Sequence, residues 1–206
     1  MLQMNLCNSG RAGCYTGRAV PRAADVIAAE APDVVTLNEI CRDDGEAGAT
    51  LRAARAGGTV VSAFQAAGDR PPAVPPRCNN GEPYGIGLLT RFVGRDARSS
   101  VHRGTYPAQD LADPEERVWL CVRGDGLHAC TTHLANTSGR VALAQCAGSC
   151  SARGAGDPGG AGARRRSSAV TSTCAPVARR TCARAAGRLT GGSTTVPGSR
   201  SWRPAA

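Results

Sequence analysis

The chain has 206 residues, enough for one domain, with 25 basic residues, all arginine, and 16 acidic residues, giving a formal net charge of +9. No apolar stretch is long enough to span a membrane, and no pair among the ten cysteines forms a CxxC motif, which disfavours a zinc site. Residues 1–146 carry 15 arginines and 15 acidic residues, whereas residues 147–206 carry ten arginines and one acidic residue. The basic excess therefore belongs to the end of the chain, and by itself it favours an anionic partner such as nucleic acid.

The amino-terminal segment predicts a βαβ unit. Residues 2–7 predict a short strand, residues 18–32 a helix with one apolar face, and residues 33–41 ("DVVTLNEIC") a buried strand. The two strands of such a unit run parallel. Asn5 and Glu39 lie near their carboxyl ends, so we expect both residues at one edge of the sheet, where open α/β sheets place their sites.

Further elements alternate with loops in the middle of the chain. Hydrophobic patterning and glycine or proline breaks predict a helix at 46–56, a strand at 59–67, a loop at 70–83, a strand at 84–91 and mostly loop at 92–114.

A hairpin follows in "ERVWLCVRGDGLHACTTHLAN", with Asp125 and Gly126 as a two-residue type I′ turn. This turn places Cys121 opposite Cys130 in a non-hydrogen-bonded pair, with Cα atoms about 4.5 Å apart. That separation is at the short end of the range for a disulfide, and we expect one here. Proximity in the predicted topology also favours two other bridges and leaves Cys146 without a partner. These two bridges are Cys7–Cys14 and Cys41–Cys78.

Disulfides indicate an exported protein, because they persist in oxidising compartments. The chain begins "MLQMNLC", without the charged and apolar regions of a signal peptide. We therefore expect a secreted, monomeric parent protein, with either a true start upstream or an incomplete copy here.

Composition changes near residues 146–147. Residues 138–146 predict a helix that is cut off, and residues 147–206 contain few large apolar side chains. Such a segment cannot bury enough surface to offset its ordering entropy. We expect a domain at 1–146 and a disordered tail rich in Arg, Ala, Gly and Ser at 147–206.

Four residues could carry chemistry together: Asn5, Glu39, Arg117 and His133. They suit metal-assisted phosphodiester hydrolysis, with Glu39 holding Mg²⁺, Arg117 binding phosphate and His133 transferring a proton. Each residue alone also fits a structural role, as a solvated glutamate, a turn-capping asparagine, a surface arginine or a structural histidine.

The ordered motifs "QMNLC", "DVVTLNEIC", "YGIGLLTR", "ERVWLCV" and "TTHL" resemble the endonuclease/exonuclease/phosphatase superfamily, the fold of pancreatic-type deoxyribonucleases and sphingomyelinases. The resemblance covers residues 2–146, and Asn38 stands where the family often has Gln. It implies an α/β fold of two packed sheets flanked by helices, incomplete here, with Mg²⁺ or a similar divalent cation and a phosphate-ester substrate. It also implies that Asn5 and His133 are catalytic, Glu39 binds the metal and Arg117 binds phosphate.

The second half of the family pattern, with its "GDxN" and "SDH"-like motifs, is missing. No histidine follows His133, and Asp157 is the one acidic residue after 146. We expect this chain to be inactive or nearly so. A shifted reading frame across codons 167–174 permits apolar-apolar-Gly-Gly-Asp-apolar-Asn-Leu, which matches the missing motif, so we expect the tail to be out of frame.

Two other classes of function stay open. The protein could instead bind nucleic acid through its basic tail, or be a structural or signalling member of the fold without catalysis. The sequence does not separate DNA, RNA, a lipid head group or a small phosphate ester as the substrate.

Overall fold

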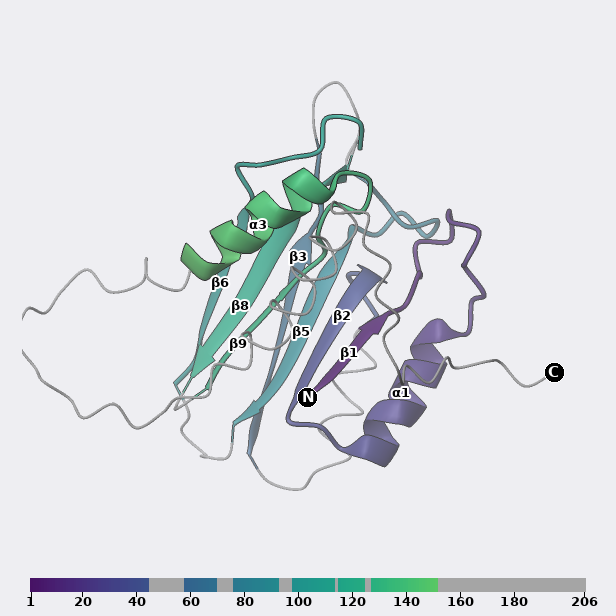
Figure 1. Cartoon of the computed structure of the whole chain (residues 1–206). Coiled ribbons are helices and arrows are strands. Elements are labelled where there is room, and N and C mark those ends of the chain that lie inside the picture. Colours follow the sequence, from purple (N-terminus) through teal and green to yellow (C-terminus); the bar gives the residue numbers. More distant parts are fainter. Residues whose placement is uncertain (45–57, 70–75, 93–97, 114, 125–126, 152–206) are drawn as a thin grey trace, which may run out of the picture.

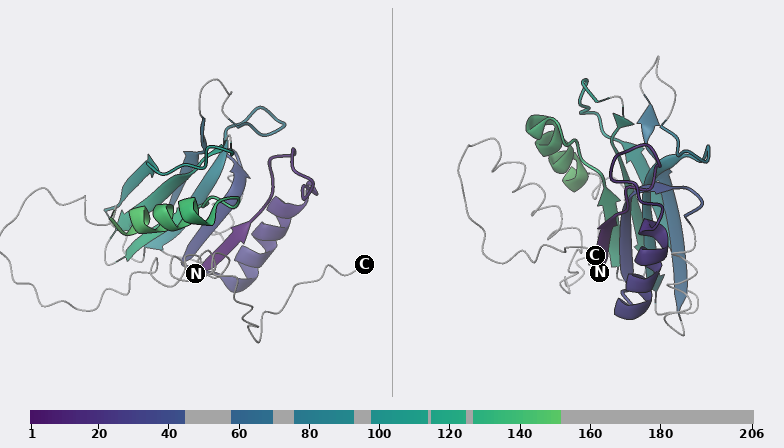
Figure 2. Two further views of the ribbon diagram at one scale, coloured as in Figure 1. Left: turned by 45° about the horizontal axis from the view of Figure 1, so that its top comes forward. Right: turned by 90° about the vertical axis from the view of Figure 1, so that its right-hand side faces the viewer.

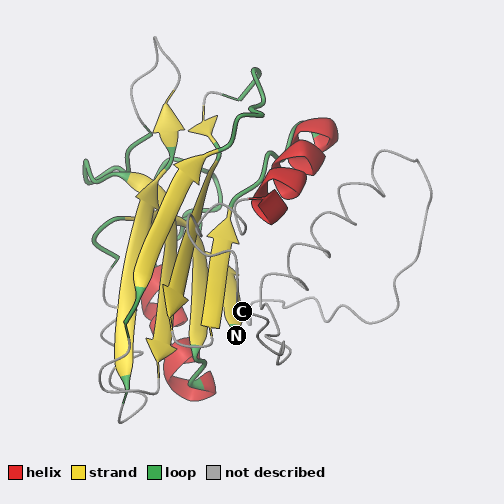
Figure 3. Ribbon diagram, turned by 90° about the vertical axis from the view of Figure 1, so that its left-hand side faces the viewer, coloured by secondary structure: helices red, strands yellow, loops and turns green. Residues whose placement is uncertain are grey.

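The computed structural model describes residues 1–44, 58–69, 76–92, 98–113, 115–124 and 127–151. Two sheets pack face to face at its centre, and helices α1 and α3 lie on opposite sides of them (Figures 1 and 2). The strands form two layers when the domain is seen from its side (Figure 3). This arrangement confirms the predicted α/β class with two packed sheets flanked by helices.

The first sheet contains β1 (Leu2–Asn5), β2 (Val34–Cys41), β3 (Thr59–Ala66) and β5 (Tyr84–Phe92), in the order β1-β2-β5-β3. β1 and β2 are parallel, with Asn5 opposite Asn38, and their carboxyl ends point to the same edge in Figure 1. The predicted βαβ unit is therefore confirmed. β5 pairs antiparallel with both of its neighbours, and almost all its residues are buried, as its continuous apolar sequence predicts.

Helix α1 (Ala19–Glu30) covers the outer face of the first sheet. Its buried Ala23 and Ile27 pack against apolar side chains of β2 and β5, including Val35 and Leu89. The helix ends where Ala31 takes a left-handed conformation, φ 41°, immediately before Pro32, which cannot continue the helix.

The second sheet contains β6 (Ser100–Thr105), β8 (Val118–Gly124) and β9 (Leu127–Thr132), all antiparallel. Cys121 lies opposite Cys130, as the hairpin register predicts, although the turn residues 125–126 lie outside the described part. The stretch 92–114, predicted to be mostly loop, has most of its described residues outside strands, but β6 occupies six of them. β6 was missed because five of its six side chains are exposed, so the strand lacks apolar alternation.

The core between the sheets joins β2 and β5 to β8 and β9 through apolar side chains. These are Val34, Ile86, Leu88, Phe92, Val118, Leu120, Val122 and Ala129. A further two-stranded sheet pairs β4 (Gly68–Asp69) with β7 (Glu115–Glu116) at the end of this core.

Helix α3 (Gly139–Ser151) differs from the prediction, because it continues past residue 146. Its fully buried Gln145 accepts a hydrogen bond from the Ala135 amide and donates to the Ala108 carbonyl, both at 2.9 Å. Cys146 is disulfide-bonded, so the prediction that it lacks a partner was wrong. That prediction had considered only the cysteines up to residue 146, because it expected the rest of the chain to be disordered. The predicted helix at 46–56 and the tail from 152 lie outside the described residues.

All three predicted disulfides are present. Cys7–Cys14 closes a loop after β1, Cys41–Cys78 ties the end of β2 to the segment before β5, and Cys121–Cys130 joins β8 to β9. Among the described helices, neither has the length and apolar character needed to cross a membrane.

Candidate functional site

Glu39 interrupts the regular pairing of β2 with β5. The register shifts between Asn38 and Ile40, and Glu39 has φ 58°, in the left-handed region that residues other than glycine rarely adopt. Such a bulge inserts an extra residue, so Ile40 returns to the helix-facing side with Leu37 while Glu39 leaves the ladder. The bulge therefore aims the Glu39 carboxylate toward the end of β1 and the end of β9.

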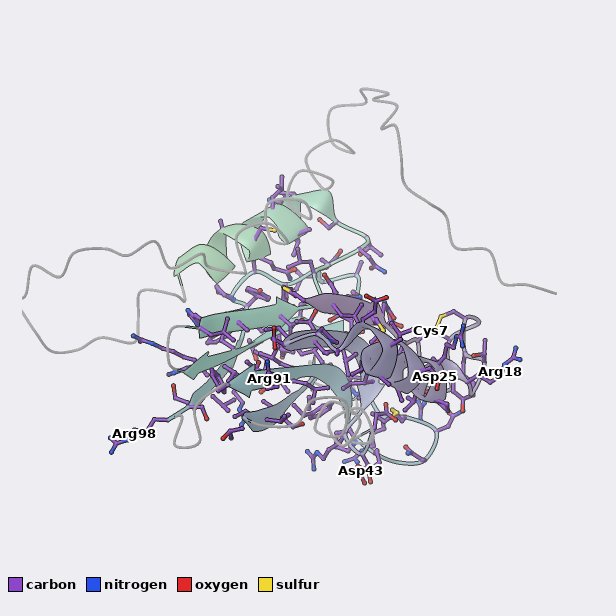
Figure 4. All side chains as sticks on the ribbon, turned by 90° about the horizontal axis from the view of Figure 1, so that it is seen from below. Cys7, Arg18, Asp25, Asp43, Arg91 and Arg98 are labelled. Carbon is purple, nitrogen blue, oxygen red and sulfur yellow. A yellow bond between two sulfur atoms is a disulfide. The ribbon has the colours of Figure 1, made fainter. Side chains whose placement is uncertain are left out.

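Asn5 fixes one oxygen of this carboxylate. Its Nδ2 donates to Glu39 Oε1 at 2.6 Å, while its Oδ1 accepts a hydrogen bond from the Cys7 amide at 3.0 Å. These two contacts define which way the amide points. The Cys7–Cys14 disulfide lies beside the same carboxylate, with both sulfurs within 4.8 Å of a Glu39 oxygen, and Figure 4 marks Cys7 at this end of the domain.

His133 approaches the carboxylate from the second sheet, one residue beyond β9. Its Nε2 lies 3.6 Å from Glu39 Oε1, and its Nδ1 lies 2.9 Å from an Nη1 atom of Arg117. A guanidinium can donate but not accept, so Nδ1 is the acceptor and the neutral ring carries its proton on Nε2. Burial, reinforced by the charge of Arg117, lowers the pKa of His133 from 6.5 to about 4, so the ring is neutral at physiological pH.

Arg117 is buried, with 3% of its surface exposed. Its guanidinium forms ion pairs with Asp113 at 2.6 Å and Glu115 at 2.9 Å. Gln109 holds its backbone from both sides, accepting from the amide at 2.8 Å and donating to the carbonyl at 2.9 Å. The interpretation of Arg117 as a surface residue is therefore wrong, and its two terminal nitrogens are engaged by carboxylates and His133.

Two carboxylates share this one guanidinium. Burial raises the pKa of Glu115 from 4.5 to about 7; Arg117 opposes the shift and Asp113 adds to it. The 2.9 Å contact alone would suggest a fully ionised pair, but burial outweighs it because the arginine also neutralises Asp113. Burial first, then Glu115 and Glu39, raises the pKa of Tyr84 well above its usual range, so its hydroxyl stays un-ionised.

The structure brings Asn5, Glu39, Arg117 and His133 together, as the sequence predicts. It adds four residues that sequence reasoning missed: Gln109, Asp113, Glu115 and Tyr84. The available signal was the alternation of Asp113, Glu115 and Arg117, because residues two apart in an extended segment project to the same side.

The donor set fits a divalent cation held largely by water. Asn5 and His133 both face Glu39 Oε1, and within the described residues no hydrogen bond reaches Oε2. The Glu39 side chain is 20% exposed, so the carboxylate is accessible to a ligand. Mg²⁺ binds through one or two carboxylates and keeps several waters, so Glu39 alone could anchor it.

No family model matches the chain, and no curated protein matches it either. Among solved structures, it is similar to an endonuclease/exonuclease/phosphatase from Beutenbergia cavernae, at 22% identity and a TM-score of 0.45, covering 70% of this chain and 40% of that one. It is also similar to D. rerio TDP2 complexed with a single-strand DNA product (13%, TM-score 0.48, 76% and 54%) and to ANGEL2, a 2′,3′-cyclic phosphatase (17%, 0.43, 65% and 36%). The chain thus spans less than two thirds of each of these proteins.

Proposed function

We propose that this site belongs to a metal-dependent phosphoesterase of the endonuclease/exonuclease/phosphatase type. The observation that carries the proposal is the aim of Glu39: a strained bulge turns its carboxylate to where Asn5 and His133 converge from two different sheets. Strained backbone at the meeting point of polar side chains is typical of a functional site.

Each side chain has a distinct part in this proposal. Glu39 would hold the divalent cation through Oε2, and Asn5 orients the carboxylate by donating to Oε1. The bound cation would supply positive charge that offsets the charge of a phosphate in the transition state. His133 carries its proton on Nε2, so it can donate a hydrogen bond to a phosphate oxygen beside Glu39.

Arg117 acts in this proposal as a positioning residue. Its hydrogen bond to Nδ1 holds the tautomer and the ring orientation of His133. The earlier prediction that Arg117 binds phosphate would require the phosphate to displace Asp113 or Glu115 from the guanidinium. The positioning role needs no such rearrangement.

Metal binding tests the proposal directly. Titration calorimetry with Mn²⁺ or Mg²⁺ should show one site that Glu39→Gln weakens at least tenfold, because the amide lacks the anionic oxygen. Glu30→Gln, which removes a charge from the exposed end of α1, is the matched control and should bind as the unchanged chain does. Equal affinity of the Glu39→Gln variant and the unchanged chain would refute the proposal.

Hydrolysis should be weak in this chain, because its sequence contains no histidine after His133 and no "GDxN" motif. A substantial Mg²⁺-dependent nuclease or phosphatase rate in the purified chain would contradict this.

We attribute the missing motifs to a shifted reading frame after residue 146. The nucleotide sequence checks that attribution, and it fails if no alternative frame encodes Gly-Asp-x-Asn near codons 167–174.

A further inference from the structure

A second polar site lies at the opposite lateral edge of the two sheets. β3 is the edge strand of the first sheet and β6 the edge strand of the second, and a pocket of about 430 Å³ lies between them. Its polar lining comes from Arg42, Ser62, Gln65 and Arg103, with the Phe64 ring among them.

Two arginines are anchored to one residue of this pocket. The Arg42 guanidinium lies over the Phe64 ring, 5.8 Å from its centroid, and Arg103 donates to the Phe64 carbonyl at 3.2 Å. Among the described residues, neither guanidinium contacts a carboxylate. Two like charges that converge without a counter-charge repel each other, and an anion between them would relieve the repulsion.

We propose that this pocket binds a second phosphate of the substrate, away from the phosphate that is hydrolysed, so that the substrate is a nucleic-acid strand of several nucleotides. The inference rests on the proposed function for the identity of the first phosphate. The chemistry of the pocket does not depend on it: guanidinium groups bind phosphate with two parallel hydrogen bonds, and hydroxyl and amide groups complete such sites.

Distance separates the two phosphate positions. Most of the pocket lining lies on β3, which is two strands, or about 10 Å, away from β2 across the sheet, although Arg42 itself follows the end of β2. One phosphate group cannot reach both places. A strand with repeating phosphates can, since single-stranded sites commonly cover about 4–16 nucleotides.

Anisotropy of a fluorescent single-stranded DNA of about 12 nucleotides tests the inference on the full chain. Replacing Arg42 and Arg103 with glutamine should weaken binding about tenfold or more, because hydrogen bonds from a charged donor to phosphate are stronger than those from a neutral amide. The slope of log affinity against log salt should fall by about 0.7, the value for one lost phosphate contact on a single strand. The matched control replaces Arg18 and Arg22 with glutamine, because both are exposed and lie at α1. Figure 4 shows that Arg18 projects from a different side of the domain than Asp43, which is next to Arg42 in the chain.

The control pair removes the same two charges and should change affinity less than about twofold. Equal losses in both pairs would overturn the inference, because binding would then depend on net charge alone. Weaker binding to vesicles of anionic lipid, with DNA binding unchanged, would also overturn it and assign the pocket to a lipid surface. If instead the proposed function fails, the outcome is distinguishable. Mn²⁺ affinity would be unchanged in Glu39→Gln, while replacement of Arg42 and Arg103 would still weaken DNA binding.

Discussion

At the end of the first sheet, Asn5 and Glu39 reach the site through the backbone: parallel strands bring them together, a bulge turns the carboxylate, and a disulfide lies beside it. At the end of the second sheet, Arg117 and His133 are held through side chains, by a buried network in which one guanidinium serves two carboxylates and an imidazole. The one site thus combines two means of positioning, and each has a different weakness. Removing a charge should destabilise the network around Arg117 and His133. Relieving the backbone strain at Glu39 should change the stability of the half that holds Asn5 and Glu39.

The largest effect is expected from Arg117→Met. The change leaves Asp113 and Glu115 buried without their counter-charge, which costs about 3–5 kcal/mol of unfolding free energy. Urea unfolding followed by circular dichroism measures it. Arg22→Met is the control, because the Arg22–Asp25 pair is mostly exposed and should contribute less than about 1 kcal/mol. Similar losses in the two variants would mean that the network is not the support we describe.

The pH dependence of stability separates two members of the same network. The pKa of Glu115 is about 7 folded and 4.5 unfolded, so its stabilising contribution is present below pH 4.5 and is lost as the pH rises to 7. The pKa of His133 is about 4 folded and 6.5 unfolded, so its contribution is present above pH 6.5 and is lost as the pH falls to 4. Between pH 4.5 and 6.5 the two slopes oppose each other, and the unchanged chain should show little net slope from these groups.

Single variants should expose each slope. Glu115→Gln leaves the histidine, so the unfolding free energy should rise from pH 4 to 6.5 by on the order of 2–3 kcal/mol. His133→Gln leaves the Glu115 carboxyl, so the unfolding free energy should fall by a similar amount from pH 4.5 to 7. Chemical denaturation across this range gives both slopes; variants with the same slope as the unchanged chain would refute the assignment.

The first half depends on covalent support. Replacing Cys7 and Cys14 with serine removes a short closed loop, which should cost about 2.5 kcal/mol on the chain-entropy estimate. The Cys7 amide that orients Asn5 should also become less fixed, so Mn²⁺ affinity should fall together with stability. Replacing Cys121 and Cys130 instead removes a bridge far from Glu39 in the chain and should leave Mn²⁺ affinity unchanged. A loss of Mn²⁺ affinity in both pairs would show a general effect of destabilisation.

The sequence predicted the first half of the candidate site better than the residues that support the second half. Asn5 and Glu39 could be placed because apolar runs define strands, and parallel strands must end at one edge. The hairpin register and the three disulfides followed from turn chemistry and topology in the same way. Asp113, Glu115 and Gln109 were missed because they come from a segment without hydrophobic period, where burial is decided by contacts with the rest of the fold. The bulge at Glu39 was missed as well, since nothing in "VTLNEIC" marks a left-handed residue.

The bulge gives the smallest but most specific prediction. Glu39→Ala and Glu39→Gly remove the same contacts with Asn5 and His133, yet alanine keeps the Cβ that a φ of 58° disfavours. The glycine variant should therefore be more stable than the alanine variant by about 1 kcal/mol. At Gln3, an exposed position in the regular part of β1, the order should reverse, because glycine weakens an ordinary strand. Thermal unfolding of the four variants measures both differences, and an alanine variant at position 39 at least as stable as the glycine variant would mean that Glu39 carries no strain.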